Sequence, residues 1–135
     1  MIIKLFFSAF MIIGIISCNN GTPDVVDKRI PLRTDTINVV KLSDTLVIYE
    51  STCRGCAYEA STNFSISDSM NMIRLINVIT TDNNSPEMDG GSISKKLVLV
   101  PVKTGTTNIK LYKFWQMERT AKDSALFTSY KIEVK

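Results

Sequence analysis

The clearest structural signal in the chain is the alternation within KTGTTNIKLYKFW, residues 103–115. In this segment Ile109 and Leu111 fall on one side of an extended chain, and Lys110 falls on the other. Successive side chains of a β-strand point to opposite faces, so this pattern is typical of a strand that packs one face on a core. This segment therefore contains the most clearly predicted β-strand of the chain.

Six further runs of β-type sequence surround this segment, separated by Ser, Thr, Asn, Asp and Gly. In chain order the predicted strands are Thr36–Val40, Thr45–Tyr49, Phe64–Ile66, Met72–Ile79, Lys96–Val102, Asn108–Tyr112 and Tyr130–Val134. Outside the N-terminal segment no run long enough for a helix has a 3.6-residue period. The number and spacing of the runs predict an all-β domain over residues 34–135, an immunoglobulin-like antiparallel β-sandwich of about seven strands.

Three features of this domain carry more detailed expectations. Met72–Ile79 is nearly continuously apolar, as expected of a strand covered on both faces. Pro101 lacks an N–H for a strand ladder, which indicates a bulge or an edge strand. Gln116–Phe127 fits either a helical turn or a long hairpin loop, and the sequence does not decide between them.

Residues 1–17 have the organisation of a bacterial lipoprotein signal peptide. Lys4 supplies a positive charge, Leu5–Ile16 is apolar, and Ile15-Ile16-Ser17-Cys18 resembles the lipobox that is cleaved before its cysteine. The apolar run is short for a membrane span, which favours a cleaved signal. The alternative is an ordinary secretory signal followed by a chance cysteine.

Cys18 is therefore the expected site of lipid attachment. Residues 18–33 carry Gly21, Pro23 and Pro31 among several charges and show no apolar period, so they are expected to form a flexible tether. Acyl chains on the cysteine would hold the domain on a membrane surface without spanning it. The expected location is the bacterial cell envelope, either periplasmic or surface-exposed.

The composition argues against several classes of function. The chain has no histidine, which removes Ser-His and Cys-His catalysis and the commonest zinc ligand. The formal net charge is +3 with both signs interspersed, so no basic surface for nucleic acid is expected. We expect a protein that is not an enzyme, with no metal site, no cofactor and no small-molecule substrate.

Cys53 and Cys56 form a Cys-X-X-Cys motif directly after a predicted strand. In an exported protein a disulfide is the first expectation, and it would fix the shape of one exposed loop. A thioredoxin-like redox site would need a helix beginning at Cys53, and the Ser/Thr-rich sequence after Cys56 does not predict one. A thiolate metal site would need two more ligands. The disulfide is preferred, and the other two roles stay open.

Two further places suggest binding. Gly90-Gly91 lies in a polar stretch between two predicted strands and is either a flexible turn or a backbone that approaches a partner closely. Phe114-Trp115 follows the strand Asn108–Tyr112. The tryptophan is either a core residue or an aromatic contact presented at a strand end.

In order along the chain, these places resemble the signature of the chagasin-type inhibitors of papain-like cysteine peptidases. Proteins of that family are small immunoglobulin-like domains whose three loops at one end enter the protease cleft. Lys103–Trp115 looks like the family's glycine turn, alternating strand and terminal basic-X-Trp, and Gly90-Gly91 resembles its second loop. Asp44–Ile48 resembles the strand that enters the first loop, and Ser51–Cys56 lies at the position of that loop.

The first loop also departs from the family pattern. Gly55 falls on the family's glycine and Tyr58 lies near its following aromatic residue, but Cys53 and Cys56 replace an Asn-Pro-Thr-Thr run. A disulfide would then supply the rigidity of this loop. Phe114 replaces the usual proline.

The resemblance implies a membrane-anchored, monomeric inhibitor of a papain-like cysteine protease, which blocks the active-site cleft with three loops. The implied contact residues are Thr52, Cys53, Arg54, Gly55, Cys56, Asp89, Gly90, Gly91, Lys113, Phe114, Trp115 and Gln116. The main alternative is an envelope lipoprotein with the same sandwich that binds another protein or a glycan. It predicts a buried Trp115 and a mobile Gly90-Gly91. A thiol–disulfide enzyme is the third class, and it predicts an accessible thiolate at Cys53.

Overall fold

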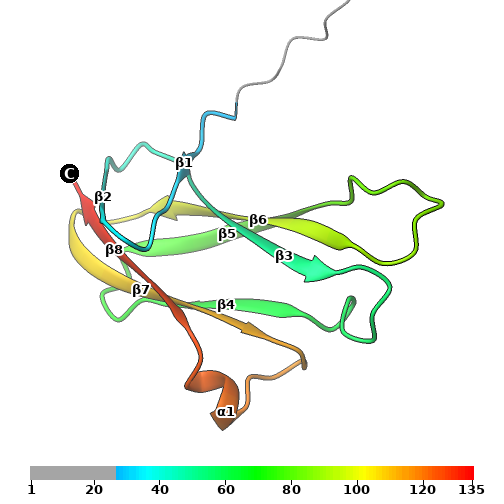
Figure 1. The fold of residues 1–135 in the computed structure, drawn as a ribbon. Coiled ribbons are helices and arrows are strands. Elements are labelled where there is room, and N and C mark those ends of the chain that lie inside the picture. The colour runs from blue at the N-terminus through cyan, green and yellow to red at the C-terminus, as the bar shows by residue number, and fades with distance from the viewer. Residues whose placement is uncertain (1–26) are drawn as a thin grey trace, which may run out of the picture.

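The computed structural model describes residues 27–135, which form two packed β-sheets and one short helix (Figure 1). The elements are β1 (Ile30–Pro31), β2 (Ile37–Val40), β3 (Leu46–Cys53), β4 (Asn63–Ser67), β5 (Ile73–Thr81), β6 (Ser92–Pro101), β7 (Gly105–Phe114), α1 (Ala121–Ser124) and β8 (Thr128–Val134). One sheet has the order β1-β3-β6-β5 and the other β2-β8-β7-β4. The predicted β-sandwich is confirmed.

Apolar side chains on the facing sides of the two sheets form the core. Leu46 lies opposite Leu99 and Ile48 opposite Leu97 in one sheet, and none of these four side chains is more than 2% exposed. Ile132 contributes from β8 in the other sheet and is fully buried. The alternation that predicted the strands thus places their apolar faces between the sheets.

All seven predicted strands are present, and the structure adds β1 as an eighth in the described part of the chain. Ile30–Pro31 pairs with the start of β3, and Leu32 is buried, so ordered structure begins before residue 34. The proposed signal peptide, Cys18 and the first part of the tether lie outside the described residues.

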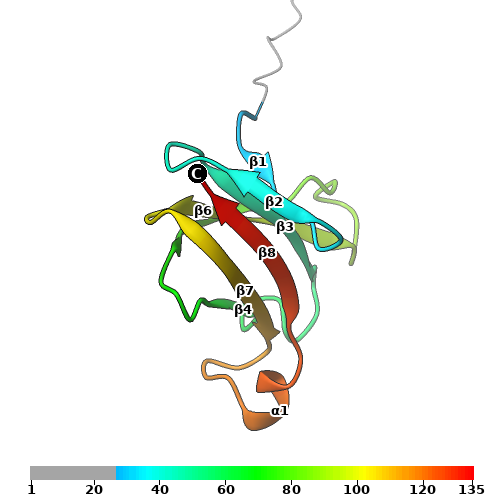
Figure 2. The same cartoon turned by 90° about the vertical axis from the view of Figure 1, so that its left-hand side faces the viewer.

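The sandwich is not wholly antiparallel, contrary to the prediction. β1 pairs with β3 in parallel, and β2 pairs with β8 in parallel (Figure 2), whereas the other pairs are antiparallel. Both parallel pairs involve the N-terminal part of the domain, which lies along strands contributed by later parts of the chain. Neighbours that are distant in sequence cannot be identified from the alternation of a single strand.

Two detailed expectations about the strands are wrong. β5 lies at a sheet edge and is not covered on both faces, since Ile76 is 53% exposed at a register shift between Leu75 and Asn77. Pro101 ends β6, a central strand, and pairs in register with Ile73, so it lies neither in an edge strand nor at the bulge, which is opposite Leu99 and Val98. The pairing of β3 with β6 has already ended at Leu99, so the missing N–H of Pro101 costs no ladder bond on that side.

Asp68 organises the connection between β4 and β5. Its carboxylate accepts hydrogen bonds from the backbone amides of Met70 (3.0 Å), Met72 (2.7 Å) and Ile73 (2.8 Å), and from Thr107 Oγ1 (2.6 Å). Burial opposes ionisation of this group, but these hydrogen bonds outweigh it and hold the pKa of Asp68 below its usual range. The ionised carboxylate therefore joins the turn to β7.

Candidate functional site

Three loops are joined at one end of the sandwich: the first and second lie at the right of Figure 1, and the third, which carries α1, lies at the bottom of the view. The first loop, residues 54–62, joins β3 to β4; the second loop, residues 82–91, joins β5 to β6; and the third loop, residues 115–127, joins β7 to β8 and contains α1. The opposite end, here called the distal end, carries the connections β2–β3, β4–β5 and β6–β7.

Arg54 links the first loop to the second. Its Nε donates to Asp82 Oδ2 at 2.8 Å, and its backbone amide donates to the carbonyl of Gly91 at 3.0 Å. Its Nη1 also donates to the carbonyl of Met88. The side chain of Arg54 therefore holds the start and middle of the second loop against the first, and its backbone amide holds the end.

Hydrogen bonds favour the ionised form of Asp82, whose carboxylate accepts a hydrogen bond from Arg54. The backbone amide of Asn84 and its side chain contribute most, followed by Arg54, and together they hold the pKa of Asp82 below its usual range. Asn84 also donates to the carbonyl of Ser92 at 2.8 Å. The second loop is thus closed on itself as well as joined to the first.

A disulfide joins Cys53 and Cys56, as predicted. Within the four-residue ring, Gly55 adopts a φ of +72°, and its amide donates to Glu59 Oε2 at 2.5 Å. Residues 54–61 form bends and turns, so no helix begins at Cys53 to support a thioredoxin-like site. The disulfide constrains the tip of the first loop.

Gly90 and Gly91 have a structural reason to be glycine. Their φ angles are +80° and +96°, which L side chains rarely adopt. A Cβ on Gly91 would lie 2.8 Å from Asn84 Oδ1, and a Cβ on Gly55 would lie 3.9 Å from the amide nitrogen of Gly90. The positive φ angles of Gly90 and Gly91 therefore give the second loop its shape, and the missing Cβ of Gly91 leaves room for Asn84.

Trp115 connects the third loop to the first. Its ring lies 5.4 Å from that of Tyr58, centroid to centroid, and the two side chains are 44% and 55% exposed. Asn63 Nδ2 donates to the carbonyl of Gln116 at 3.0 Å, which fixes the chain directly after the tryptophan. Trp115 is therefore a presented aromatic residue and not a core residue.

Three residues expected to make contacts are buried or partly buried. Thr52 and Phe114 are buried, at 3% and 6% exposure, so their side chains support the loops from below. Lys113 is half-buried and reaches from β7 toward β3, with its Nζ 3.6 Å from Glu50 Oε2 and donating to the carbonyl of Ser51. The same Nζ lies 6.0 Å from the ring centroid of Trp115. The remaining expected residues, Cys53 to Cys56, Asp89 to Gly91, Trp115 and Gln116, are half-buried or exposed at this end.

The charge of Glu50 also affects the ionisation of a tyrosine below the loops. Burial, and then the negative charge of Glu50, raise the pKa of Tyr130, which lies on β8. The hydroxyl of Thr52 on β3 has no hydrogen-bond partner within the described part of the chain. The interior below the loops is thus partly polar.

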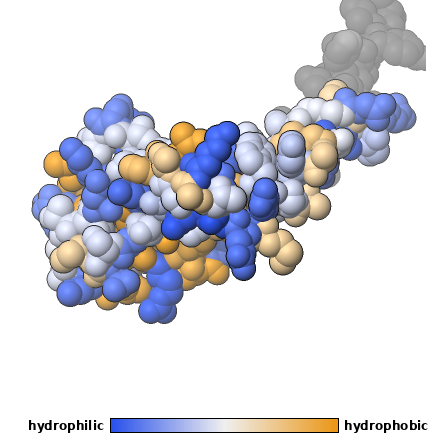
Figure 3. All heavy atoms as spheres, turned by 90° about the horizontal axis from the view of Figure 1, so that it is seen from below, coloured by the Kyte–Doolittle hydropathy of each residue, from blue (hydrophilic) through white to orange (hydrophobic). Residues whose placement is uncertain are grey.

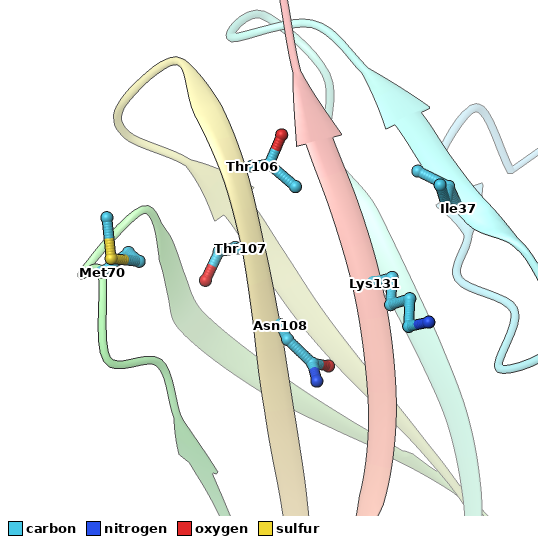
Figure 4. Close-up of a pocket in the computed structure, with 6 residues that line it drawn as sticks. All are labelled: Ile37, Met70, Thr106, Thr107, Asn108 and Lys131. Atoms are coloured by element: carbon cyan, nitrogen blue, oxygen red, sulfur yellow. The ribbon is translucent and has the colours of Figure 1, made fainter.

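A hollow lies between the first and second loops, lined by Arg54, Gly55, Glu59, Asp82, Pro86, Met88, Asp89 and Gly90. Sequence reasoning had singled out Arg54, Gly55, Asp89 and Gly90. It missed Asp82 and Met88, whose only sequence signal is their place in the stretch that contains the glycines. A second, mostly apolar hollow lies near the distal end, where Met70 and Ile37 flank Thr106, Thr107, Asn108 and Lys131 (Figure 4).

Comparison with known proteins gives the fold a precedent. No family model matches the chain, and no curated protein matches its sequence. The structure is similar to that of the cysteine protease inhibitor EhICP2 from Entamoeba histolytica, with a TM-score of 0.55, 19% identity, and coverage of 78% of this chain and 95% of that one. The chain shares its fold with a cysteine protease inhibitor. The solution structure of amebosin is also similar, with a TM-score of 0.54, 15% identity, and coverage of 79% and 98%.

These likenesses confirm the fold implied by the chagasin-type resemblance. Among residues 27–135, no group of three or more His, Cys, Asp or Glu side chains is placed to hold a metal ion. No helix in the same range is long and apolar enough to cross a membrane.

Proposed function

We propose that this protein inhibits papain-like cysteine proteases by inserting its three loops into the active-site cleft. The observation that carries the proposal is the exposed Trp115, packed on Tyr58 at the end of the sandwich where Arg54 joins the other two loops. EhICP2, a cysteine protease inhibitor, supports the proposal by sharing the fold.

The mechanism requires no reaction by the inhibitor. The first loop, closed by the disulfide, and the second loop, shaped by Gly90 and Gly91, would fill the cleft and exclude substrate and water from the protease's Cys-His pair. Hydrogen bonds between the loops limit their freedom before binding, so less conformational entropy is lost on association. Trp115 would contribute the largest single contact, as buried aromatic residues commonly do in interfaces.

The alternative functions fit the site less well. A sandwich lipoprotein that binds a different protein or a glycan remains the second candidate, but it predicted a buried Trp115 and a flexible Gly90-Gly91. The side chain is 44% exposed, and the carbonyl of Gly91 accepts a hydrogen bond from the amide of Arg54. A thiol–disulfide enzyme lacks the helix at Cys53 that would stabilise a thiolate.

We further propose that the inhibitor is a monomer attached through lipid on Cys18 to the bacterial cell envelope, on its periplasmic or outer surface. The support is the sequence of residues 1–18. Attachment there would protect envelope proteins from the cell's own proteases or those of its neighbours. Metabolic labelling with a fatty acid, lost in Cys18→Ala, tests this part separately.

Titration of papain with the purified chain tests the inhibitory function. The protease is activated with a thiol, which is removed before mixing so that the Cys53–Cys56 disulfide stays intact. We expect inhibition with a constant below about 1 μM, and a rise of about 100-fold in Trp115→Ala, the size of a strong interface contact. The matched control is Leu42→Ala, because Leu42 is 46% exposed at the distal end.

Absence of inhibition across a panel of papain-like proteases, by a chain shown to be folded, would contradict the proposal. Equal loss of inhibition in Trp115→Ala and Leu42→Ala would contradict the position of the contact surface.

A further inference from the structure

The distal end presents an exposed apolar side chain on each of its three turns. Leu42 lies in the β2–β3 turn, Met70 in the β4–β5 turn and Val102 in the β6–β7 turn, and they are 46%, 51% and 43% exposed. These three side chains are here called the turn tips. Single exposed apolar residues are ordinary, and Figure 3 shows such residues among polar ones on the face that it views. One on every turn of the same end is a more specific arrangement.

The strand order places the three turns side by side. β3, β6 and β5 are consecutive neighbours in one sheet, and each of the three turns adjoins the distal end of one of them. Neighbouring strands lie about 4.8 Å apart, so the turns leave the sheet within about 10 Å of one another. The amide of Val102 donates to the carbonyl of Met72 at 2.7 Å, which joins two of the turns directly. Met70 also borders the apolar hollow in Figure 4, with Ile37 on the other side, so apolar surface continues onto β2.

Two lysines accompany the turn tips. Lys41 and Lys103 each lie next to a turn tip in sequence, both are exposed, and neither forms an ion pair within residues 27–135. The acidic groups of these turns are engaged locally, since Asp44 Oδ2 accepts a hydrogen bond from the amide of Lys41 at 2.7 Å and Asp68 accepts the four already described. Exposed apolar side chains with lysines beside them suit the boundary of a lipid bilayer, where the ammonium groups reach the phosphates.

The N-terminal part of the described chain joins the domain at this end. The amide of Ile30 donates to the carbonyl of Thr45 at 2.9 Å, which lies in the β2–β3 turn. Cys18 precedes Asp27 by nine positions, so a lipid on Cys18 would lie within about 32 Å of Asp27. The loop end is farther from Ile30 by the length of β3, about 25 Å for its 8 residues. A membrane that holds Cys18 is therefore within reach of the turn tips.

We propose that the distal end docks on the surface of the membrane that holds Cys18, with the turn tips in the headgroup region and the two lysines at lipid phosphates. This inference rests on the proposed lipid attachment and not on protease inhibition. Three side chains make a weak contact alone, but the lipid would make docking intramolecular, at an effective concentration on the order of 1 mM. The three loops would then face away from the membrane, because β7 extends about 30 Å between the two ends over its 10 residues.

Fluorescence quenching tests this docking on the lipidated protein, reconstituted in vesicles of phosphatidylethanolamine and phosphatidylglycerol. An environment-sensitive probe is attached to Met70→Cys or to the matched control Met88→Cys in the second loop, with the Cys53–Cys56 disulfide left intact. Met70 and Met88 are 51% and 52% exposed, so the two positions differ mainly in the end of the sandwich to which they belong. We expect a nitroxide-labelled lipid to quench the probe at position 70 at least about twofold more than the probe at position 88, since interfacial apolar groups lie within the headgroup layer.

A further variant separates docking by the domain from attraction of the probe itself to lipid. In Leu42→Ser/Val102→Ser, labelled at position 70, quenching should fall toward the value at position 88. The urea midpoint should stay unchanged, because both substituted side chains are exposed. Unchanged quenching in this variant would overturn the inference.

The remaining outcomes separate the inference from the lipid attachment on which it rests. If wild type incorporates fatty acid but the probe at position 70 is quenched no more than the probe at position 88, docking is overturned and the attachment stands. If wild type dimerises through the turn tips, as shown by a monomeric Leu42→Ser/Val102→Ser, and the two probes are quenched equally, these residues serve self-association and the inference is overturned. If wild type incorporates no fatty acid, both proposals fall, and the titration of papain is unaffected.

Discussion

The two ends of the sandwich are built differently inside. Near the distal end the interior is largely apolar, with Leu46, Leu99 and Ile132 fully buried, and its buried polar side chains, Asn38 and Thr107, are hydrogen-bonded. Below the three loops, Glu50 and Lys113 face one another across the interior. The difference indicates that the distal half supplies most of the stability of the fold, whereas polar contacts at the loop end set the positions of the loops.

Truncation of a distal core residue should have the largest effect on stability. Ile132→Ala removes a fully buried side chain and is expected to lower the free energy of unfolding by about 2–5 kcal/mol, through lost burial and a residual cavity. Urea denaturation measures this change. Ile37→Ala is the control, because Ile37 is 55% exposed and should change the free energy by less than about 0.5 kcal/mol. A similar effect of the two substitutions would argue against a distal core.

Asp68→Asn should have the next largest effect, about 2 kcal/mol, since the amide replaces a charge that accepts four hydrogen bonds. The pKa of Asp68 in the folded state is below its ordinary value of 3.8. Its contribution is therefore complete above that value and is lost as the pH falls through the folded-state pKa. Urea midpoints should decline less steeply with acid in Asp68→Asn than in wild type, and Asp35→Asn, at an exposed position, should retain the wild-type slope.

Arg54→Ala, at the loop end, should weaken inhibition more than it lowers the stability of the fold. The pair with Asp82 is partly exposed and screened by solvent, so its loss should cost little stability. Inhibition should nevertheless weaken about tenfold, because the second loop loses its side-chain connections to the first, at Asp82 and Met88, and must be ordered on binding. Arg74→Ala on β5 is the control, and a drop in stability larger than the drop in binding free energy would contradict the division between the two ends.

Much of this fold could be predicted because each strand has its own signal. The alternation of Ile109 and Leu111 required only local information. β1 was missed because a two-residue strand that contains Pro31 has no period to detect, and the parallel partners of β1 and β2 depend on chain packing. The segment 116–127, left open between loop and helix, contains both, since the capping box of Thr120 and Asp123 supports only one turn.

The candidate site was predicted in its parts but not in its connections. The cysteines, the glycine pair and Trp115 have recognisable sequence patterns. The contacts of Arg54 with Asp82 and Met88 join residues from separate loops, so no local pattern reveals them. The inward direction of Lys113 depends on the register of β7, which places it opposite Phe64 of β4 and within reach of Glu50.

Hydrogen exchange of the free and papain-bound chain would test most directly whether the loop end is the binding surface. The account predicts slower exchange on binding in residues 53–59, 82–91 and 115–118, with unchanged exchange in the distal turns at residues 41–45, 68–72 and 102–105. Protection confined to the distal turns, or spread without preference over both ends, would contradict it.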